Sequence, residues 1–165
     1  MLKSGEFCRW PGRLYHETPG WVKSGSIFHV RLRVGPACRR LLTEPQLADG
    51  LLNAACHYHR NGHWYCMLFL LMPDHLHALL AFPHGRSMSN IVGSWKRYTA
   101  LAFRVSWQRN FFDHRIRKNR GLSEKWHYIL RNPVAKGLCD RETDWRWSWS
   151  PHDRAPVERS VAEFE

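Results

Sequence analysis

The long stretch between residues 65 and 82 is mostly apolar, and it limits the folds that this chain can adopt. Its length would suit a membrane span, but a proline, an aspartate and two histidines between residues 73 and 77 interrupt it. Such side chains are costly in a lipid-spanning helix. The stretch is better explained as two buried strands, at 63–72 and 75–82, joined by a turn at Pro73-Asp74.

The other elements follow from alternation and from helix-capping signals. Residues 27–34 alternate between apolar and polar side chains, which is typical of a strand with one buried face. Thr43 and Gln46 form a capping-box pattern, and helical spacing then continues to Asn61-Gly62. Further signals predict a helix capped by Ser87, a strand at 111–117, and a helix that Ser123 caps and that ends near Asn132-Pro133.

This order of elements predicts an α+β fold. A split βαβ arrangement gives a ferredoxin-like antiparallel sheet with two helices on one face, plus an added C-terminal helix that carries Tyr128. The 165 residues are expected to form a single domain over 1–165, with 1–20 as an N-terminal extension and 151–165 as a solvated tail.

Charge and cysteine content narrow the class of partner and compartment. The 25 basic and 14 acidic residues leave a net charge of +11, which indicates a polyanionic partner such as nucleic acid. The five cysteines are odd in number and have no CxxC spacing, so neither a disulfide framework nor a cysteine-rich zinc site is predicted. With no signal-peptide core in the first 30 residues, we expect a cytoplasmic protein, associated with the nucleoid and without a membrane partner.

Two histidines form the sharpest local pattern. His75 and His77 flank Leu76 within a predicted strand, so strand alternation places both imidazoles on the same face. They could converge on one divalent cation if a third ligand came from elsewhere. The alternative is chance, because the chain contains 11 histidines.

A tyrosine and an asparagine form the second pattern. Tyr128 and Asn132 are one helical turn apart, so they lie on one face, and the Asn132 carbonyl oxygen would complete a set of ligands suited to Mg²⁺ or Mn²⁺. The alternative is a core tyrosine followed by an Asn-Pro helix end. Tyr98 is a weaker candidate because Ala102 follows it at the ligand position, and an ordinary surface pair explains Asp113-His114.

These motifs resemble those of a known family. MPDHLH at 72–77 and YILRNPV at 128–134 look like the two signatures of the REP-associated tyrosine transposases, a branch of the single-tyrosine, His-hydrophobic-His nucleases. WQRNFFDHRIR at 107–117 and WRWS at 145–148 are similar to the family's linking segment and to its segment beyond the helix. The resemblance covers residues 27–151.

The resemblance implies specific roles. The paired metal ligands fall on His75 and His77, the third ligand on Asn132, and the nucleophile on Tyr128. The implied activity is that of a single-stranded DNA endonuclease and strand transferase. Such an enzyme cleaves near hairpins of palindromic, REP-like repeats, through a 5′-phosphotyrosine intermediate and with a free 3′-hydroxyl. The resemblance favours a monomer, and a dimer stays open because some relatives exchange helices.

Basic and aromatic residues are interleaved between 86 and 120, which suits a groove for unpaired DNA. The expected phosphate contacts are Lys96, Arg97, Arg104, Arg109, Arg115, Arg117, Lys118 and Arg120. Two other functions stay open on the sequence alone. A DNA hairpin-binding module without catalysis would bind in the presence of a chelator. An HxH metallohydrolase with water as nucleophile would leave no covalent adduct and would tolerate Tyr128→Phe.

Overall fold

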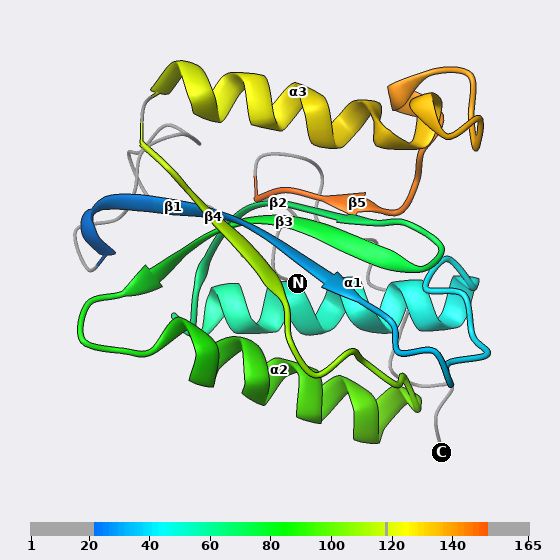
Figure 1. Cartoon of the computed structure of the whole chain (residues 1–165), viewed down its shortest axis with the longest axis horizontal. Coiled ribbons are helices and arrows are strands. Elements are labelled where there is room, and N and C mark those ends of the chain that lie inside the picture. Colours follow the sequence, from blue (N-terminus) through cyan, green and yellow to red (C-terminus); the bar gives the residue numbers. More distant parts are fainter. Residues whose placement is uncertain (1–21, 118, 152–165) are drawn as a thin grey trace, which may run out of the picture.

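The computed structural model describes residues 22–117 and 119–151 (Figure 1). In chain order the elements are β1 (Val22–Arg33), α1 (Pro45–Arg60), β2 (Tyr65–Leu71), β3 (His75–Pro83), α2 (Met88–Phe103), β4 (Phe112–Ile116), α3 (Asn119–Ala135), the 3-10 helix η1 (Glu142–Asp144) and β5 (Ser148–Trp149). The predicted N-terminal extension, 1–20, and the predicted tail, apart from residue 151, lie outside the described residues.

The five strands form one sheet in the order β4-β1-β3-β2-β5, and all neighbours are antiparallel. The first four strands have the ferredoxin-like order, so the predicted α+β fold is confirmed. β2 and β3 form the predicted hairpin. β5 is an edge strand that the sequence analysis does not predict, because two residues are too short to show alternation.

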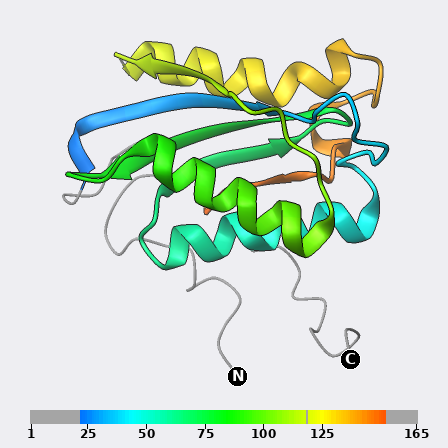
Figure 2. The same ribbon diagram turned by 60° about the horizontal axis from the view of Figure 1, so that its bottom comes forward.

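The helices cover both faces of the sheet. α1 and α2 lie on one face and α3 on the other, as Figures 1 and 2 show. Under α1 and α2 the core is large and aromatic, with the Trp95 ring 6.0 Å from that of Trp64 and 5.6 Å from that of Phe69. Under α3 a smaller apolar cluster packs around Leu122 and Ile129 of the helix. In the part of the chain described, no helix is both long enough and apolar enough to span a membrane.

The N-terminus of α1 corrects one prediction. Glu44, and not Thr43, is the N-cap residue, and its side chain makes no capping hydrogen bond to the helix. The Glu44 carboxylate instead accepts hydrogen bonds from the Arg40 guanidinium and from the Leu41 N–H. Pro45 has no N–H to satisfy and has φ preset for the first helical turn, so the helix begins there without a side-chain cap.

The predicted C-terminal end of α1 and the predicted N-cap of α2 are confirmed. α1 ends at Arg60 with Asn61 as its C-cap, and Gly62 follows at φ +67°. Ser87 caps α2, since its hydroxyl oxygen accepts a hydrogen bond from the Asn90 N–H at 3.3 Å.

Both predicted ends of α3 are wrong. The helix begins at Asn119, before Ser123, and it runs through Pro133 to Ala135. Pro133 has no N–H for the Ile129 carbonyl, and the Asn132 side-chain amide substitutes for it, donating to Ile129 O at 3.5 Å and to Tyr128 O at 2.8 Å. Asn132 therefore allows the helix to continue past the proline.

A glycine ends α3 two residues further on. Gly137 has φ +68° and donates to Val134 O at 2.9 Å, while the Leu138 N–H donates to Pro133 O at 2.9 Å. This pair of bonds is a Schellman motif, which requires the left-handed conformation that glycine adopts without strain.

Candidate active site

β3 presents the histidine pair on the face that α3 covers. Leu76 and Leu80 belong to the core under α1 and α2, whereas Leu79 belongs to the cluster under α3. Because strand side chains alternate, His75 and His77 share the face of Leu79. Strand alternation therefore places both predicted ligands on one side of the sheet, as expected.

The two imidazoles meet through their Nε2 atoms. His75 Nε2 lies 3.1 Å from His77 Nε2, and the rings are nearly perpendicular, at 83°. The other nitrogen of His75, Nδ1, lies 2.6 Å from Asp74 Oδ1, and Arg33 donates to Asp74 Oδ2 at 2.9 Å. His77 is only 2% exposed, whereas the His75 side chain is partly exposed, so the pair consists of one buried imidazole and one near the surface.

A third histidine, His29 on β1, completes the cluster, and the sequence analysis does not predict it. His29 Nε2 lies 2.9 Å from His77 Nδ1, and the rings stack at 21° with their centres 5.1 Å apart. Alternation within 27–34 does leave His29 on the face opposite the core. Its contact with His77 depends on the register between β1 and β3, which pairs Arg31 with His77, and no local pattern shows this register.

Burial keeps the inner imidazoles neutral. It lowers the pKa of His77 to about 3, helped by the neighbouring His75 and His29, and lowers the pKa of His29 to about 4, helped by Lys125 and Arg31. For Asp74, burial alone would raise the pKa, but the hydrogen bonds from His75 and Arg33 outweigh burial and lower it. At neutral pH the cluster therefore has unprotonated nitrogens for a cation and a charged carboxylate behind His75.

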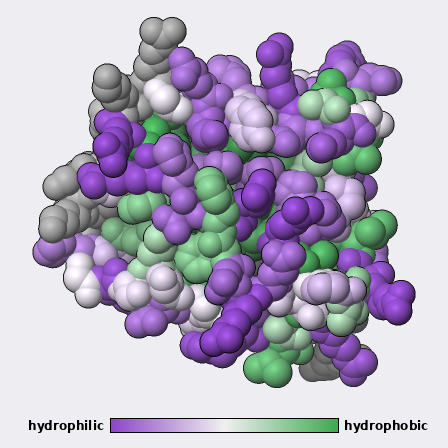
Figure 3. Space-filling model, viewed as in Figure 1, coloured by the Kyte–Doolittle hydropathy of each residue, from purple (hydrophilic) through white to green (hydrophobic). Residues whose placement is uncertain are grey.

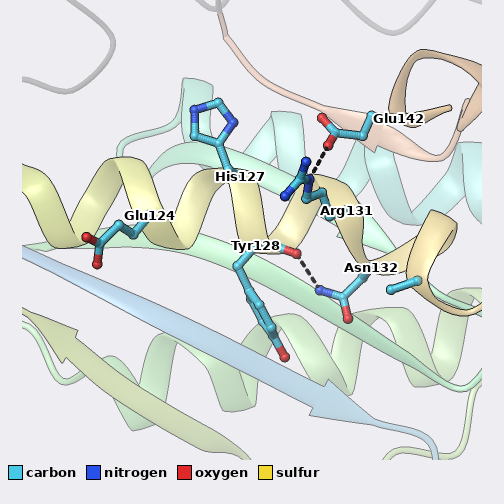
Figure 4. A pocket seen from close by; sticks show the side chains of 7 residues that line it. Glu124, His127, Tyr128, Arg131, Asn132 and Glu142 are labelled. Atoms are coloured by element: carbon cyan, nitrogen blue, oxygen red, sulfur yellow. Dashed lines mark hydrogen bonds and ion pairs between the residues drawn. The ribbon is translucent and has the colours of Figure 1, made fainter.

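α3 places Tyr128 over this cluster. The Tyr128 ring centre lies 6.2 Å from that of His77 and 6.5 Å from that of His29, with both contacts edge-on. The side chain is 52% exposed, and Figure 4 shows the phenol pointing from the helix toward the sheet. The next residue, Ile129, is fully buried, which fixes the rotation of the helix. Lys125 Nζ lies 4.8 Å from the centre of the Tyr128 ring.

Asn132 lies one turn after Tyr128. Because its amide nitrogen donates to helix carbonyls, its side-chain oxygen stays available, and Figure 4 shows this oxygen on the same side of α3 as the phenol. Both residues line a pocket of about 640 Å³ along the helix, together with Arg131 and Glu142, which form an ion pair at 3.2 Å.

The histidine pair fits a divalent cation. Two nitrogens 3.1 Å apart match two ligands bound about 2.1 Å from one ion at an angle near 90°. Across residues 22–117 and 119–151, no group of three or more His, Cys, Asp and Glu side chains is arranged to hold one metal ion. The amide oxygen of Asn132 is a candidate third ligand of another type.

The predicted phosphate contacts are spread over several elements. Arg97 and Arg104 are exposed on or just after α2, the helix on the far side of the sheet from Tyr128. Lys96, also on α2, donates to the Gln108 and Arg109 carbonyls at 2.6 and 2.9 Å and so holds the loop before β4. Arg109, Arg115 and Arg117 are exposed on or beside β4, and the side chains of Lys118 and Arg120 lie outside the described residues.

Two basic residues that the sequence does not single out lie at this site. Lys125 Nζ is beside the Tyr128 ring, and the Arg31 guanidinium lies 5.3 Å from the ring centre of Phe112. Both charges help to lower the pKa of His29 and of His77. The sequence offers two alternative candidates, Tyr98 and the Asp113-His114 pair. Tyr98 lies on α2, and His114 lies on β4 opposite His29 in the strand register.

Fold and site together define a class of protein: a ferredoxin-like sheet with a histidine pair on a central strand and a tyrosine on an added helix. The chain belongs to the IS200-like transposase family, since the sequence profile of that family matches residues 26–126. The matched region contains His75 and His77 and ends two residues before Tyr128.

Two relatives agree with this assignment. A protein of Haemophilus influenzae described as a REP-associated tyrosine transposase is 27% identical over an alignment of 96 residues, which covers 47% of this chain and 54% of the relative. The chain thus spans about half the length of this curated relative. The solved structure of a REP-associated tyrosine transposase bound to a REP hairpin matches with a TM-score of 0.65 and 22% identity, over 89% of this chain and 86% of that one. The resemblance seen in the motifs is confirmed, and so is the fold.

Proposed function

We propose that this protein is a single-stranded DNA endonuclease and strand transferase that acts near hairpins of palindromic, REP-like repeats. Tyr128 is the nucleophile, and His75, His77 and Asn132 hold Mg²⁺ or Mn²⁺. The observation that carries the proposal is the half-exposed Tyr128 phenol, which lies over the buried, neutral imidazoles of His77 and His29. Membership of the IS200-like family supports it, as does the REP hairpin in the solved relative.

The reaction balances without a nucleotide cofactor. The Tyr128 oxygen attacks the scissile phosphorus, the bond from phosphorus to the 3′ oxygen breaks, and that oxygen leaves with a proton as a 3′-hydroxyl. The 5′ phosphate stays on the tyrosine as a phosphodiester. Attack by a 3′-hydroxyl reverses the step and reseals the strand, since the covalent link keeps the energy of the ester.

Positive charge lies beside Tyr128. A phenol is only about 0.1% ionised at pH 7, so the nucleophile needs nearby positive charge. Lys125, beside the ring, supplies part of it, and the cation that the histidines would hold polarises the phosphate. Because half of the Tyr128 side chain is exposed, a DNA strand can reach the phenol without a rearrangement of α3.

The surface suits a flexible anionic strand. Figure 3 shows hydrophilic side chains over most of the face seen in Figure 1, with smaller hydrophobic patches between them. Phe112 is 48% exposed beside Arg31, which provides a surface for base stacking next to a cation. The described residues of one chain bring Tyr128 to the histidine pair, which favours an active monomer. With DNA as the substrate, we propose a location in the cytoplasm, at the nucleoid.

The test is covalent adduct formation. Purified protein is mixed with labelled single-stranded hairpins from the DNA that flanks its gene, with Mg²⁺, Mn²⁺ or a chelator, and is run on denaturing gels. We expect a metal-dependent adduct that Tyr128→Phe abolishes, with a loss of more than about 10⁴-fold in rate. Tyr98→Phe is the matched control, because Tyr98 is also a half-exposed tyrosine on a helix, on the far side of the sheet.

The other outcomes identify other functions. Cleaved DNA without an adduct would support a metallohydrolase that uses water. Binding without cleavage under every metal and hairpin tried would support a non-catalytic hairpin-binding module.

A further inference from the structure

A continuous series of side-chain contacts crosses the candidate site. It runs from Arg33 to Asp74 (2.9 Å), to His75 (2.6 Å), to His77 (3.1 Å), and ends on His29 (2.9 Å). Of these five residues, the proposed mechanism uses only His75 and His77. His29 is left as a buried imidazole, 4% exposed, in hydrogen-bond contact with a proposed ligand.

The protons along this series can be counted. A neutral imidazole has one N–H. His75 directs Nδ1 at the Asp74 carboxylate, which only accepts, so its proton lies on Nδ1 and its Nε2 carries a lone pair. His77 then has two choices: its proton lies on Nε2 and is donated to His75, or it lies on Nδ1 and is donated to His29.

Only the second choice suits a cation. When the His77 proton lies on Nδ1, both Nε2 atoms present lone pairs to the same point, 3.1 Å apart. That arrangement needs an acceptor at His77 Nδ1, and His29 Nε2, at 2.9 Å, is that acceptor. Outer partners of this type fix the tautomer and the orientation of metal-binding histidines.

We propose that His29 is a positioning residue that accepts the His77 Nδ1–H and thereby holds His77 Nε2 ready for a divalent cation. The inference rests on the proposed function, since it concerns the same metal site. The two ligands then have different outer partners, which match their surroundings. The surface ligand His75 has a carboxylate, and the buried ligand His77 has an uncharged acceptor, which avoids the cost of burying a charge.

Mn²⁺ binding tests the inference without DNA or activity. The full-length protein is titrated with Mn²⁺ by isothermal calorimetry, as wild type, His29→Leu and His29→Gln. Leucine removes the acceptor, and the glutamine amide oxygen restores one near the position of Nε2. We expect His29→Leu to weaken Mn²⁺ binding about 10- to 100-fold and His29→Gln to stay within about threefold of wild type. His114→Gln, on the neighbouring strand, is the control that leaves affinity unchanged.

Each result decides between roles. Wild-type affinity in His29→Leu would show that His77 needs no partner and would overturn the inference. Equal losses in both His29 variants would also overturn it, because a structural role or direct ligation by imidazole is not rescued by an amide. His75→Ala separates the two proposals: if it does not change Mn²⁺ binding, the proposed metal site itself is wrong, whatever His29 does.

A second measurement reads the tautomer directly. The ring ¹⁵N shifts of His77 with Mg²⁺ present should show the proton on Nδ1 in wild type and in His29→Gln. A His77 protonated on Nε2 in the wild type would overturn the assignment of roles.

Discussion

The two faces of the sheet are built for different purposes, although the same strands supply both. The face under α1 and α2 is apolar along its length and is filled by large aromatic side chains such as Trp64 and Trp95. The face under α3 is apolar around Ile129 and Leu79, but it becomes polar where His29 and His77 lie. Strand alternation thus lets one face stabilise the fold, while the other face presents imidazole nitrogens with free lone pairs and an exposed phenol.

The contrast between the faces shows how a small domain can keep a polar site. Buried imidazoles cost free energy unless they are hydrogen-bonded, and the buried His29 and His77 are hydrogen-bonded to each other on the α3 face. The aromatic core on the opposite face supplies the stability that such a site does not provide. Substitutions on each face in turn can test this division.

The largest effect on stability is expected on the α1 and α2 face. Trp95 is completely buried against Trp64 and Phe69, so Trp95→Ala should lower the free energy of unfolding by about 3 to 5 kcal/mol. Tyr98, three residues later on the same helix, is half exposed, and Tyr98→Ala should cost less than about 0.5 kcal/mol. Urea unfolding followed by circular dichroism measures both values. Similar costs for the two variants would contradict the assignment of stability to this face.

A smaller effect on stability is expected from the two buried histidines on the α3 face, His29 and His77. His29→Leu or His77→Leu alone leaves a buried imidazole nitrogen without its partner, which should cost about 1 to 3 kcal/mol. The double variant removes both polar groups and should be no less stable than either single variant. Urea unfolding of the four proteins gives the coupling energy, while Mn²⁺ binding should be lost in every variant that contains His77→Leu. Additive costs would show that the two imidazoles do not support each other.

The sequence predicts most of the fold, because its signals are local. Alternation in 27–34, the interrupted apolar stretch and the Ser87 cap each reflect interactions within a few residues. β5 and the ends of α3 depend on other interactions: pairing with β2, and the Asn132 amide that compensates for Pro133. One feature arises from strand pairing between distant parts of the chain and the other from side-chain geometry, and residue spacing encodes neither.

The candidate site divides in the same way. His75 and His77 are two residues apart on one strand, so the sequence alone places them on one face. The partnership of His29 with His77 joins residues 48 positions apart through the register of two strands. The proximity of Tyr128 to His77 likewise depends on how α3 crosses the sheet. The motifs identify the chemistry, and the long-range pairing positions it.

The smallest effects are expected from surface charges. Their effects on DNA cleavage and on DNA binding allow the two faces to be compared. Arg31 and Lys125 lie beside the site on the α3 face, while Arg97 and Arg104 belong to the α2 side. Arg31→Gln with Lys125→Gln should slow adduct formation at saturating hairpin about three- to tenfold, because these charges act next to the phenol and the scissile phosphate.

Arg97→Gln with Arg104→Gln should leave that rate unchanged and weaken hairpin binding instead. For each phosphate of a single strand that the protein ceases to neutralise, the slope of log affinity against log salt should fall by about 0.7. Single-turnover adduct assays and filter binding at several salt concentrations separate rate from affinity. If the α2 pair changes neither slope nor affinity, the DNA does not reach this helix, and the α3 face alone accounts for binding. If the α2 pair slows the chemical step as much as the α3 pair does, the assignment of the chemistry to the α3 face is wrong. The α2 charges lie on the opposite side of the sheet from Tyr128, where salt screens their direct effect on the phenol.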